Sequence, residues 1–281
     1  PHGDRIDNLK WGLDVTNMYT YWMRKMTFIA NSGGVPNEME QLNAGYREER
    51  YAEDPNFTRF SSWNGGNPVG QFEYLSGTPE LSKNFDDYDY TLENTMDAAD
   101  QRHDVTTRVV ISGTYTPNGF GSVATRNGGG ISFYYFKGNA IRVEAMRDMV
   151  NDRGQIPQEL RDAGLEQAIE NVLAWNPNAF NSPTASFSEG GINFYYQGVC
   201  YYTVLIRHFS NNMVPVLMGY GRYGVVRNNV YQLSINKIIG PGQPVINPPG
   251  TDPDDEDTSW ISADVNIMRW YIRNQNVEEL L

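Results

Sequence analysis

The sequence predicts an all-β protein built around a β-sandwich. Its 18 Tyr, 12 Phe and 6 Trp residues fall mostly in short runs bounded by Gly, Asn, Asp and Pro. Such runs are typical of strands joined by turns. Several of them alternate apolar with polar residues, and about seven lie between Thr106 and Ile239. We therefore expect a seven-stranded antiparallel sandwich over that range, with one helix inserted between strands.

Length and charge narrow the class further. The chain has 281 residues and a formal net charge of -12, with an isoelectric point near 4.7. An acidic surface repels nucleic acid and anionic membranes, so we expect neither as a partner. No run of about 18 apolar residues occurs, and the sequence therefore predicts no membrane-spanning helix.

The first ninety residues differ from the rest. Leu9 to Ile29 indicate one or two strands, whereas Ala30 to Asp89 are polar and show little periodicity. So long an irregular stretch is unusual inside one compact domain. We therefore divide the chain into residues 1–92, the end of one domain and its connection; 93–246, a β-sandwich domain; and 247–281, a linker and tail.

Strands are expected from residue 106 onward. In "TTRVVISGTYTP", Val109, Ile111 and Tyr115 alternate with polar or smaller residues until Pro117. The segments 129–135, "GGISFYY", and 190–196, "GGINFYY", resemble each other, and each indicates a strand entered through a Gly-Gly turn. Two copies do not define a repeat protein.

One stretch has helical periodicity. In "IPQELRDAGLEQAIENVLAW", Leu160, Leu165, Ile169 and Val172 recur every three to five residues. This spacing predicts an amphipathic helix from Gln158 to Trp175 that packs on a sheet.

Further strands are expected in "GVCYYTVLIRHF", "GRYGVV" and "VYQLSINKIIG". The single cysteine, Cys200, lies in the first of these among alternating apolar residues. We expect it to be buried and unreactive.

The sequence contains few motifs of the kind that catalytic or metal-binding sites show. His2, His103 and His208 lack the spacing of metal ligands, and neither a nucleophile motif nor a phosphate loop occurs. Acidic groups follow one another in "TDPDDEDTS" and "DDYDYTLE", but the first lacks the glycine and terminal glutamate of a calcium hand. We interpret it as a solvated linker and expect no catalytic residue, cofactor or metal.

The chain ends in a strand-forming tail behind this linker. Pro248, Pro249 and Pro253 block regular structure, and five acidic residues keep the linker extended. Along the tail Ile261, Ala263, Val265 and Ile267 share one face, and the phase then shifts. Either the tail folds back onto its own domain, or it is made for another molecule.

The stretch "MGYGRYGVVRNNVYQLSINKIIGPGQP", residues 218–244, resembles the C-terminal domain of Bacteroidales fimbrial subunits, the type V pilins or fimbrillins. The stretches "CYYTVLIRHF", "ENTMDAADQRHDVTTRVVISGTY" and "ISADVNIMRWYIRNQNVEEL" agree with it. The resemblance covers Glu93 to Leu281 and is weak over residues 1–92. We expect most of the N-terminal pilin domain to lie outside this chain.

This resemblance implies transthyretin-like β-sandwich domains and a C-terminal appendage that serves as a donor strand. It implies a fimbria attached to the outer membrane, a precursor exported as a lipoprotein, and partners that are other copies of the pilin and accessory fimbrial subunits, with host surface proteins or glycans beyond them. Strand addition of this kind is a general mode of peptide recognition. The donor residues it predicts here are Ile261, Ala263, Val265, Ile267, Trp270, Ile272, Val277 and Leu280.

Two other functions stay open at this point. A secreted carbohydrate-binding module would use exposed aromatic residues, so it matters whether Tyr134, Tyr195 and Trp270 face solvent or core. A β-sandwich hydrolase would need two carboxylates about 5–10 Å apart in a cleft. The sequence does not say whether a pilin of this kind is a stalk, anchor or tip subunit.

Overall fold

The computed structural model describes residues 3–20, 25–28, 50–53, 70–96, 98–121, 130–208, 222–254 and 261–269, with only the backbone course considered for 25–28, 50–53 and 261–269. The strands are β1 Arg5–Asp14, β2 Thr16–Asn17, β3 Lys25–Phe28, β4 Arg50–Glu53, β5 Phe72–Glu73, β6 Arg108–Thr116, β7 Phe133–Phe136, β8 Asn139–Arg142, β9 Phe187–Glu189, β10 Ile192–Tyr195, β11 Val199–Leu205, β12 Asn229–Ile238 and β13 Ile261–Arg269. The α-helices are α3 Val143–Asn151, α4 Gln158–Asp162 and α5 Leu165–Trp175, and the 3-10 helices are η3 Ala98–Asp100, η4 Arg153–Gln155 and η5 Tyr196–Gly198.

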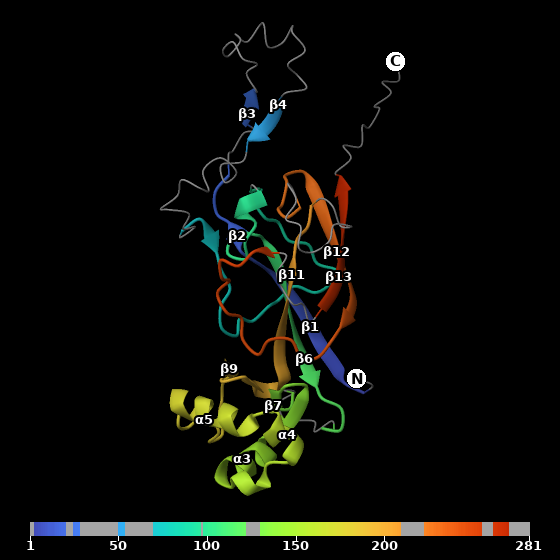
Figure 1. Cartoon of the computed structure of the whole chain (residues 1–281). Coiled ribbons are helices and arrows are strands. Elements are labelled where there is room, and N and C mark those ends of the chain that lie inside the picture. Colours follow the sequence, from blue (N-terminus) through green and yellow to red (C-terminus); the bar gives the residue numbers. More distant parts are fainter. Residues whose placement is uncertain are drawn as a thin grey trace, which may run out of the picture.

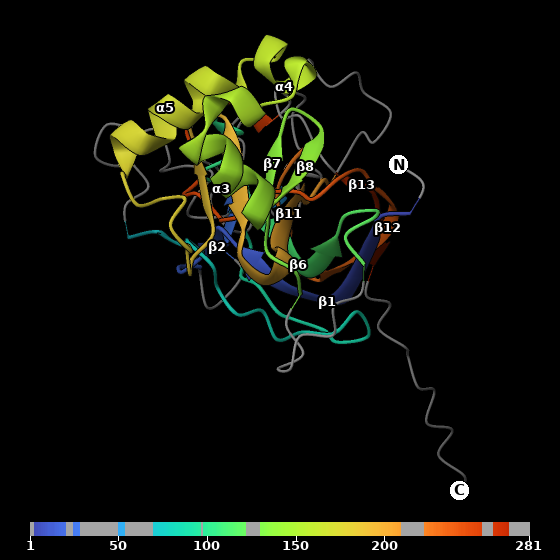
Figure 2. The same cartoon turned by 90° about the horizontal axis from the view of Figure 1, so that it is seen from below.

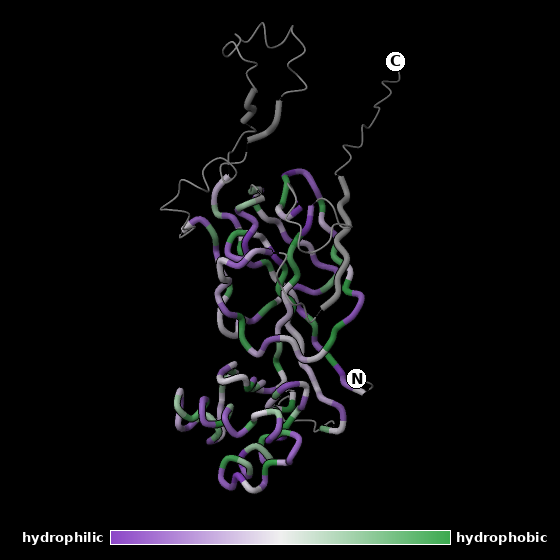
Figure 3. The backbone as a smooth tube through the Cα atoms, in the orientation of Figure 1, coloured by the Kyte–Doolittle hydropathy of each residue, from purple (hydrophilic) through white to green (hydrophobic). Residues whose placement is uncertain are grey.

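A three-stranded antiparallel sheet forms the middle of the molecule, in the order β1-β6-β11 (Figure 1). Its register places Trp11 opposite Ile111, and Ile111 opposite Tyr202. Alternate positions of β6 and β11 give this sheet an apolar face that includes Ile111, Cys200 and Tyr202. Figure 3 shows hydrophobic and hydrophilic residues interspersed along the trace of the described residues.

A second sheet covers that apolar face. It consists of β12 and β13, and Tyr231, Leu233 and Ile235 of β12 pack against the cluster on β6 and β11. The fully or nearly buried members of this cluster are Val109, Ile111, Tyr115, Phe133, Tyr195, Cys200, Tyr202, Ile206 and Val225. The two sheets therefore form the predicted sandwich.

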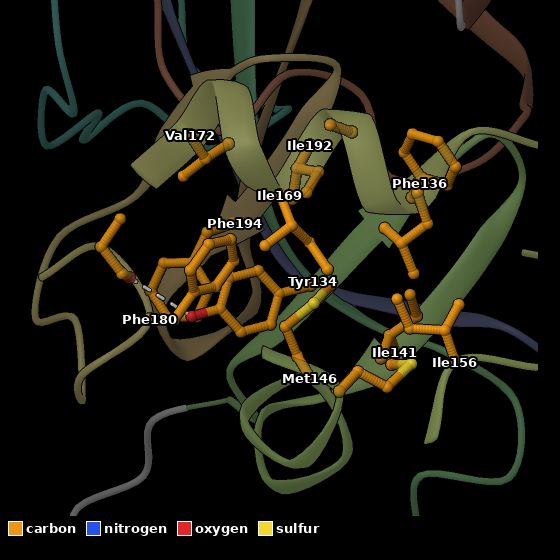
Figure 4. Packing of buried hydrophobic residues seen from close by; sticks show 14 of the residues in the cluster. Tyr134, Phe136, Ile141, Met146, Ile156, Ile169, Val172, Phe180, Ile192 and Phe194 are labelled. Atoms are coloured by element: carbon orange, nitrogen blue, oxygen red, sulfur yellow. Dashed lines mark hydrogen bonds between the residues drawn. The ribbon is translucent and has the colours of Figure 1, made fainter. Parts of the chain in front are cut away.

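A third sheet, β8-β7-β10-β9, carries the three α-helices on one face at one end of the molecule (Figures 1 and 2). The two similar aromatic segments are neighbouring strands here, with Tyr134 opposite Phe194 and Phe133 opposite Tyr195. Tyr134 and Phe194 point toward the helices, where Ile169 also lies (Figure 4). Phe133 and Tyr195 instead join the cluster of the sandwich, so both faces of this sheet are buried.

The helical part is larger than the sequence predicted. The expected helix from Gln158 to Trp175 is two helices, α4 and α5, because Gly164 adopts a left-handed conformation with φ 89° between them. The helix α3 was not expected at all. The helix has two buried residues, Met146 and Met149, and it follows a strand directly. Two apolar positions three residues apart are too few to reveal a helical period in the sequence.

The fold class is otherwise confirmed. Within the described part of Thr106 to Ile239 there are seven strands, and every pairing is antiparallel. They are distributed over three sheets rather than the two of a simple sandwich.

The N-terminal segment contributes to the same core. The strand β1 lies before residue 92 but pairs with β6 along its length. The carboxylate of Asp14, wholly buried, accepts hydrogen bonds from Arg108 Nε at 2.7 Å and from the backbone of Val15 and Leu75. The division at residue 92 stays a prediction, and β1 is built into the sheet that follows it.

Candidate assembly interface

The strand β12 is held in place at its beginning by an ion pair across the fold. Arg227 Nε donates to Glu93 Oε2 at 2.6 Å, and the side chain of Glu93 is 5% exposed. The turn after it is closed by Asn229 Nδ2, which donates to the carbonyls of Val226 and Arg227 at 3.1 Å. Residues 134 positions apart in the sequence thus fix where β12 starts.

Alternation along β12 gives it one buried and one exposed face. Tyr231, Leu233 and Ile235 are half-buried against the core, whereas Gln232 and Ser234 are exposed. The hydroxyl of Tyr231 is held in position by a hydrogen bond, which it accepts from the backbone N–H of Val226 at 2.9 Å. Burial raises the pKa of Tyr231 to about 12.

The strand β13 pairs with β12 of the same chain over its whole length. The register places Ile267 opposite Tyr231, Val265 opposite Leu233, Ala263 opposite Ile235 and Ile261 opposite Ile238. Directly opposed positions share one face of a sheet. The alternation of the tail therefore matches the positions by which β12 packs on the core, with a bulge between Ile235 and Lys237.

The structure thus shows the fold-back arrangement for Ile261–Arg269. The four donor positions 261, 263, 265 and 267 lie together on β13, and the other four, Trp270, Ile272, Val277 and Leu280, lie outside the described residues. Donation to another molecule stays a prediction. Within the described residues β13 pairs with β12 alone, which makes it an edge strand.

In the described part of the linker, residues 247–254, every residue is exposed except half-buried Pro249 and buried Asp254. Ile246 is 2% exposed and pairs with Gly77, N to O, at 2.7 Å. Asp254 is 2% exposed, and Thr106 Oγ1 donates to its Oδ2 at 2.5 Å. The prolines at 248 and 253 lie on the surface between these two anchors, so residues 247–253 are held at either side.

Sequence reasoning missed these anchors because they are long-range. Thr106 and Asp254 are 148 residues apart, and no local pattern marks a carboxylate that will be buried. From the sequence alone, Asp254 could equally be an exposed linker residue or the acceptor of a hydrogen bond from Thr106.

Cys200 is buried, as expected, with no exposed surface. Its Sγ lies 3.4 Å from the carbonyl oxygen of Gly113. Burial raises the pKa of the Cys200 thiol to about 12. At neutral pH the thiolate, which is the nucleophile, is therefore scarcely populated.

The aromatic residues that would distinguish a carbohydrate-binding module face the core. Tyr134 is 1% exposed and Tyr195 is wholly buried, with Tyr195 OH donating to the carbonyl of Gly242 at 2.7 Å. Trp270 lies outside the described residues. These two tyrosines therefore stabilise the fold and are not available to stack on a sugar.

No group of three or more His, Cys, Asp or Glu side chains within the described residues is placed to hold a metal ion. No helix among them has the length and apolar character needed to cross a bilayer.

The described residues thus form a β-sandwich in which β13 completes the sheet of β12. The sequence comparison specifies the class further. Residues 193–276 match the family model described as major fimbrial subunit protein type IV, fimbrillin, C-terminal. The matched range begins in β10 and includes β11, β12 and β13, so the C-terminal portion of this chain is fimbrillin-like. A comparison with curated proteins finds no match.

The match supports a role as a subunit of a surface fimbria that assembles with other subunits. The matched family is one of structural pilin subunits.

Proposed function

We propose that this chain is a structural, non-enzymatic subunit of a bacterial type V pilus that polymerises by inserting its C-terminal strands into a groove of the neighbouring subunit. In this proposal the groove is the position next to β12 that β13 of the same chain occupies in the structure. The observation that carries the proposal is the position of β13, a C-terminal edge strand inside the fimbrillin-like region that pairs only with β12 among the described strands.

Exchange of β13 between subunits requires no new contacts. The pairing of Val265 with Leu233 and of Ile267 with Tyr231 is the same whether both strands come from one chain or from two. Swapping an identical element between protomers is a low-cost route to assembly. If the exchange does not close on itself, each subunit receives one strand and donates one, which gives a filament.

Register secures the specificity of this exchange. A slip of one residue would place polar Asp264 and Asn266 at the positions that oppose Leu233 and Tyr231, which are the core-facing residues of β12. The same reasoning extends to Trp270, Ile272, Val277 and Leu280, which we propose complete the donor segment beyond β13.

The setting of the subunit follows the family. We propose export of its precursor as a lipoprotein, attachment of the fimbria to the outer membrane of a member of the Bacteroidales, assembly with accessory subunits, and a contribution to adhesion and virulence through host surface proteins or glycans. The position of the chain as stalk, anchor or tip does not enter this proposal.

Removal of residues 261–281 tests the proposed function. The shortened chain should form no filaments in electron micrographs under conditions in which the intact subunit polymerises. It should also bind a fluorescent synthetic peptide of residues 261–280, whereas the intact chain, whose own β13 occupies the place, should bind it slowly.

A peptide in which Val265 and Ile267 are replaced by Asp serves as the matched control. It should not bind, because an unpaired charge buried against the core costs several kcal/mol. Filament formation by the shortened chain, or equal binding of both peptides, would contradict the proposal.

A further inference from the structure

Exposed apolar side chains are concentrated in one part of the surface. Among the residues that the structure describes, eight large hydrophobic side chains are exposed, and six of them lie on two short segments. We call these six the tyrosine surface: Met18, Tyr19, Phe85, Tyr88, Tyr90 and Leu92. A contiguous exposed apolar patch on a soluble domain marks an interaction site more often than scattered apolar residues do.

The two segments meet at Asn17. Its Nδ2 donates to the carbonyl of Glu93 at 2.5 Å and to the carbonyl of Tyr19 at 2.6 Å. The amide of Asn17 therefore joins the backbone of Tyr19 to that of Glu93, which brings the two segments together at Tyr19 and Leu92.

The segment bearing the tyrosines is fixed at both ends. Asn84 forms a turn with Asp87, and its carbonyl accepts from Trp11 Nε1 at 2.6 Å. At the other end Asn94 exchanges two backbone hydrogen bonds of 2.7 Å with Val225. The teal segment that follows β5 accordingly runs outside the edge strand β1 (Figure 2).

Between these anchors the tyrosines point outward together. From residue 87 to residue 93 the chain contains no helix, turn or bend. Tyr88, Tyr90 and Leu92 are 78%, 88% and 39% exposed. Thr91 is half-buried, and Asp89 is itself exposed and lies 3.7 Å from Lys83 Nζ. A chain that runs straight repeats its side-chain direction every second residue, about 6.6 Å apart. An extended peptide has the same side-chain repeat, so it can lie alongside this segment with its side chains in register.

The charge of the surface specifies the partner further. Asp86, Asp87 and Asp89 lie among the aromatic residues, with Lys83 as the basic neighbour within the segment. Three of the four charged residues from 83 to 89 are acidic, so the same segment of a second copy would be repelled by this surface. Tyrosine faces attract Arg and Lys side chains, and Arg pairs well with carboxylates.

We propose that the tyrosine surface docks an extended, basic segment of a different protein, with Arg or Lys side chains lying on Tyr88 and Tyr90 and paired with the neighbouring aspartates. This surface is separate from the β12–β13 pairing, and the proposal does not rest on strand exchange.

The test uses the intact chain and two short fluorescein-labelled peptides, one alternating Arg with Val and one alternating Glu with Val. We expect the basic peptide to bind in fluorescence anisotropy and the acidic peptide not to bind. The double variant Tyr88→Ser/Tyr90→Ser should weaken binding roughly tenfold or more, as loss of aromatic anchors does at protein interfaces. Higher salt should weaken it as well.

The matched control is Trp175→Ser, which removes an aromatic side chain that is 53% exposed at the helical end of the molecule. It should leave peptide binding unchanged. All variants should keep the wild-type circular dichroism spectrum, because exposed side chains contribute little to stability. The double variant should also form filaments as the wild type does, which separates this test from that of assembly.

Three results would overturn the proposal. The first is equal loss of binding in Trp175→Ser and in the double variant. The second is binding to glycans on an array, but not to the basic peptide, that depends on Tyr88 and Tyr90. The third is self-association in sedimentation experiments that the double variant abolishes.

Discussion

A disulfide between β12 and β13 would fix the C-terminal strand to its own chain. Ser234 is exposed on β12, and Asp264 lies directly opposite on β13. Opposed residues in an antiparallel pair have Cα atoms about 4.5–5.5 Å apart, which lies within the range that a disulfide bridges. The variant Ser234→Cys/Asp264→Cys should therefore oxidise readily, while the buried Cys200 takes no part.

The structure gives the size of the effect on stability. The bridge closes a loop of 30 residues, for which the chain-entropy relation gives about 3.6 kcal/mol. For a protein of this size that corresponds to a rise in Tm of about 6 °C, measured by differential scanning calorimetry with and without reductant. The oxidised monomer should thus be more stable and yet unable to polymerise, because β13 cannot leave.

Filament formation, followed by electron microscopy and light scattering, measures the second part. A matched control is Lys10→Cys/Ser112→Cys, which joins opposed residues of β1 and β6, strands that the proposal keeps together. This control should assemble whether oxidised or reduced. If the oxidised β12–β13 variant polymerises as fast as its reduced form, then β13 does not need to leave β12 and the reasoning fails.

Other predictions concern the fold itself. Ile169→Ala should destabilise the protein by about 2–4 kcal/mol in urea unfolding, because Ile169 is a wholly buried residue by which α5 packs on the cluster with Tyr134 and Phe194; a cost below about 1 kcal/mol would show that the site collapses freely. Asp14→Asn should cost about 3–5 kcal/mol in the same assay, since it leaves the Arg108 charge largely buried without its partner, and an unchanged midpoint would refute this. Cys200 should react with a thiol reagent in the native protein far more slowly than in urea, and rapid native labelling would show that it is accessible. The free energy of unfolding should fall as pH rises from about 9 to 12, because Cys200 and the buried tyrosines keep their protons in the folded chain and lose them in the unfolded one; a flat profile in that range would contradict the raised pKa values.

The strands could be predicted from sequence because their pattern is local. Alternation in 108–116 and 229–238 marks β6 and β12, and the two Gly-Gly-entered segments are β7 and β10. An apolar residue at every second position arises because one face of the strand is buried. Such a strand can therefore be recognised in the sequence even when its partner strand is unknown. The partner of each strand carries no such mark, which is why the sequence did not show that β1 pairs with β6.

The helices and the linker show the limits of that approach. Gly164 interrupts a helical pattern that the spacing of Leu160, Leu165 and Ile169 continues, and a single glycine is tolerated too often in helices to mark a break. The docking of Asp254 depends on Thr106, whose hydroxyl is buried far away in the sequence. Composition alone therefore assigned to solvent a residue that the fold uses as an anchor.

Crosslinking between two variants that each carry one introduced cysteine besides the buried Cys200 tests the exchange of β13 most directly. One population carries Ser234→Cys and the other Asp264→Cys, so neither can close a β12–β13 disulfide within one chain. The two are mixed, allowed to assemble and then oxidised, and the products are separated by non-reducing electrophoresis. Strand exchange predicts a covalent heterodimer that appears only in assembled samples and vanishes on reduction. Filaments that contain no such crosslink would show that β13 remains on its own β12, and would contradict strand exchange at this interface.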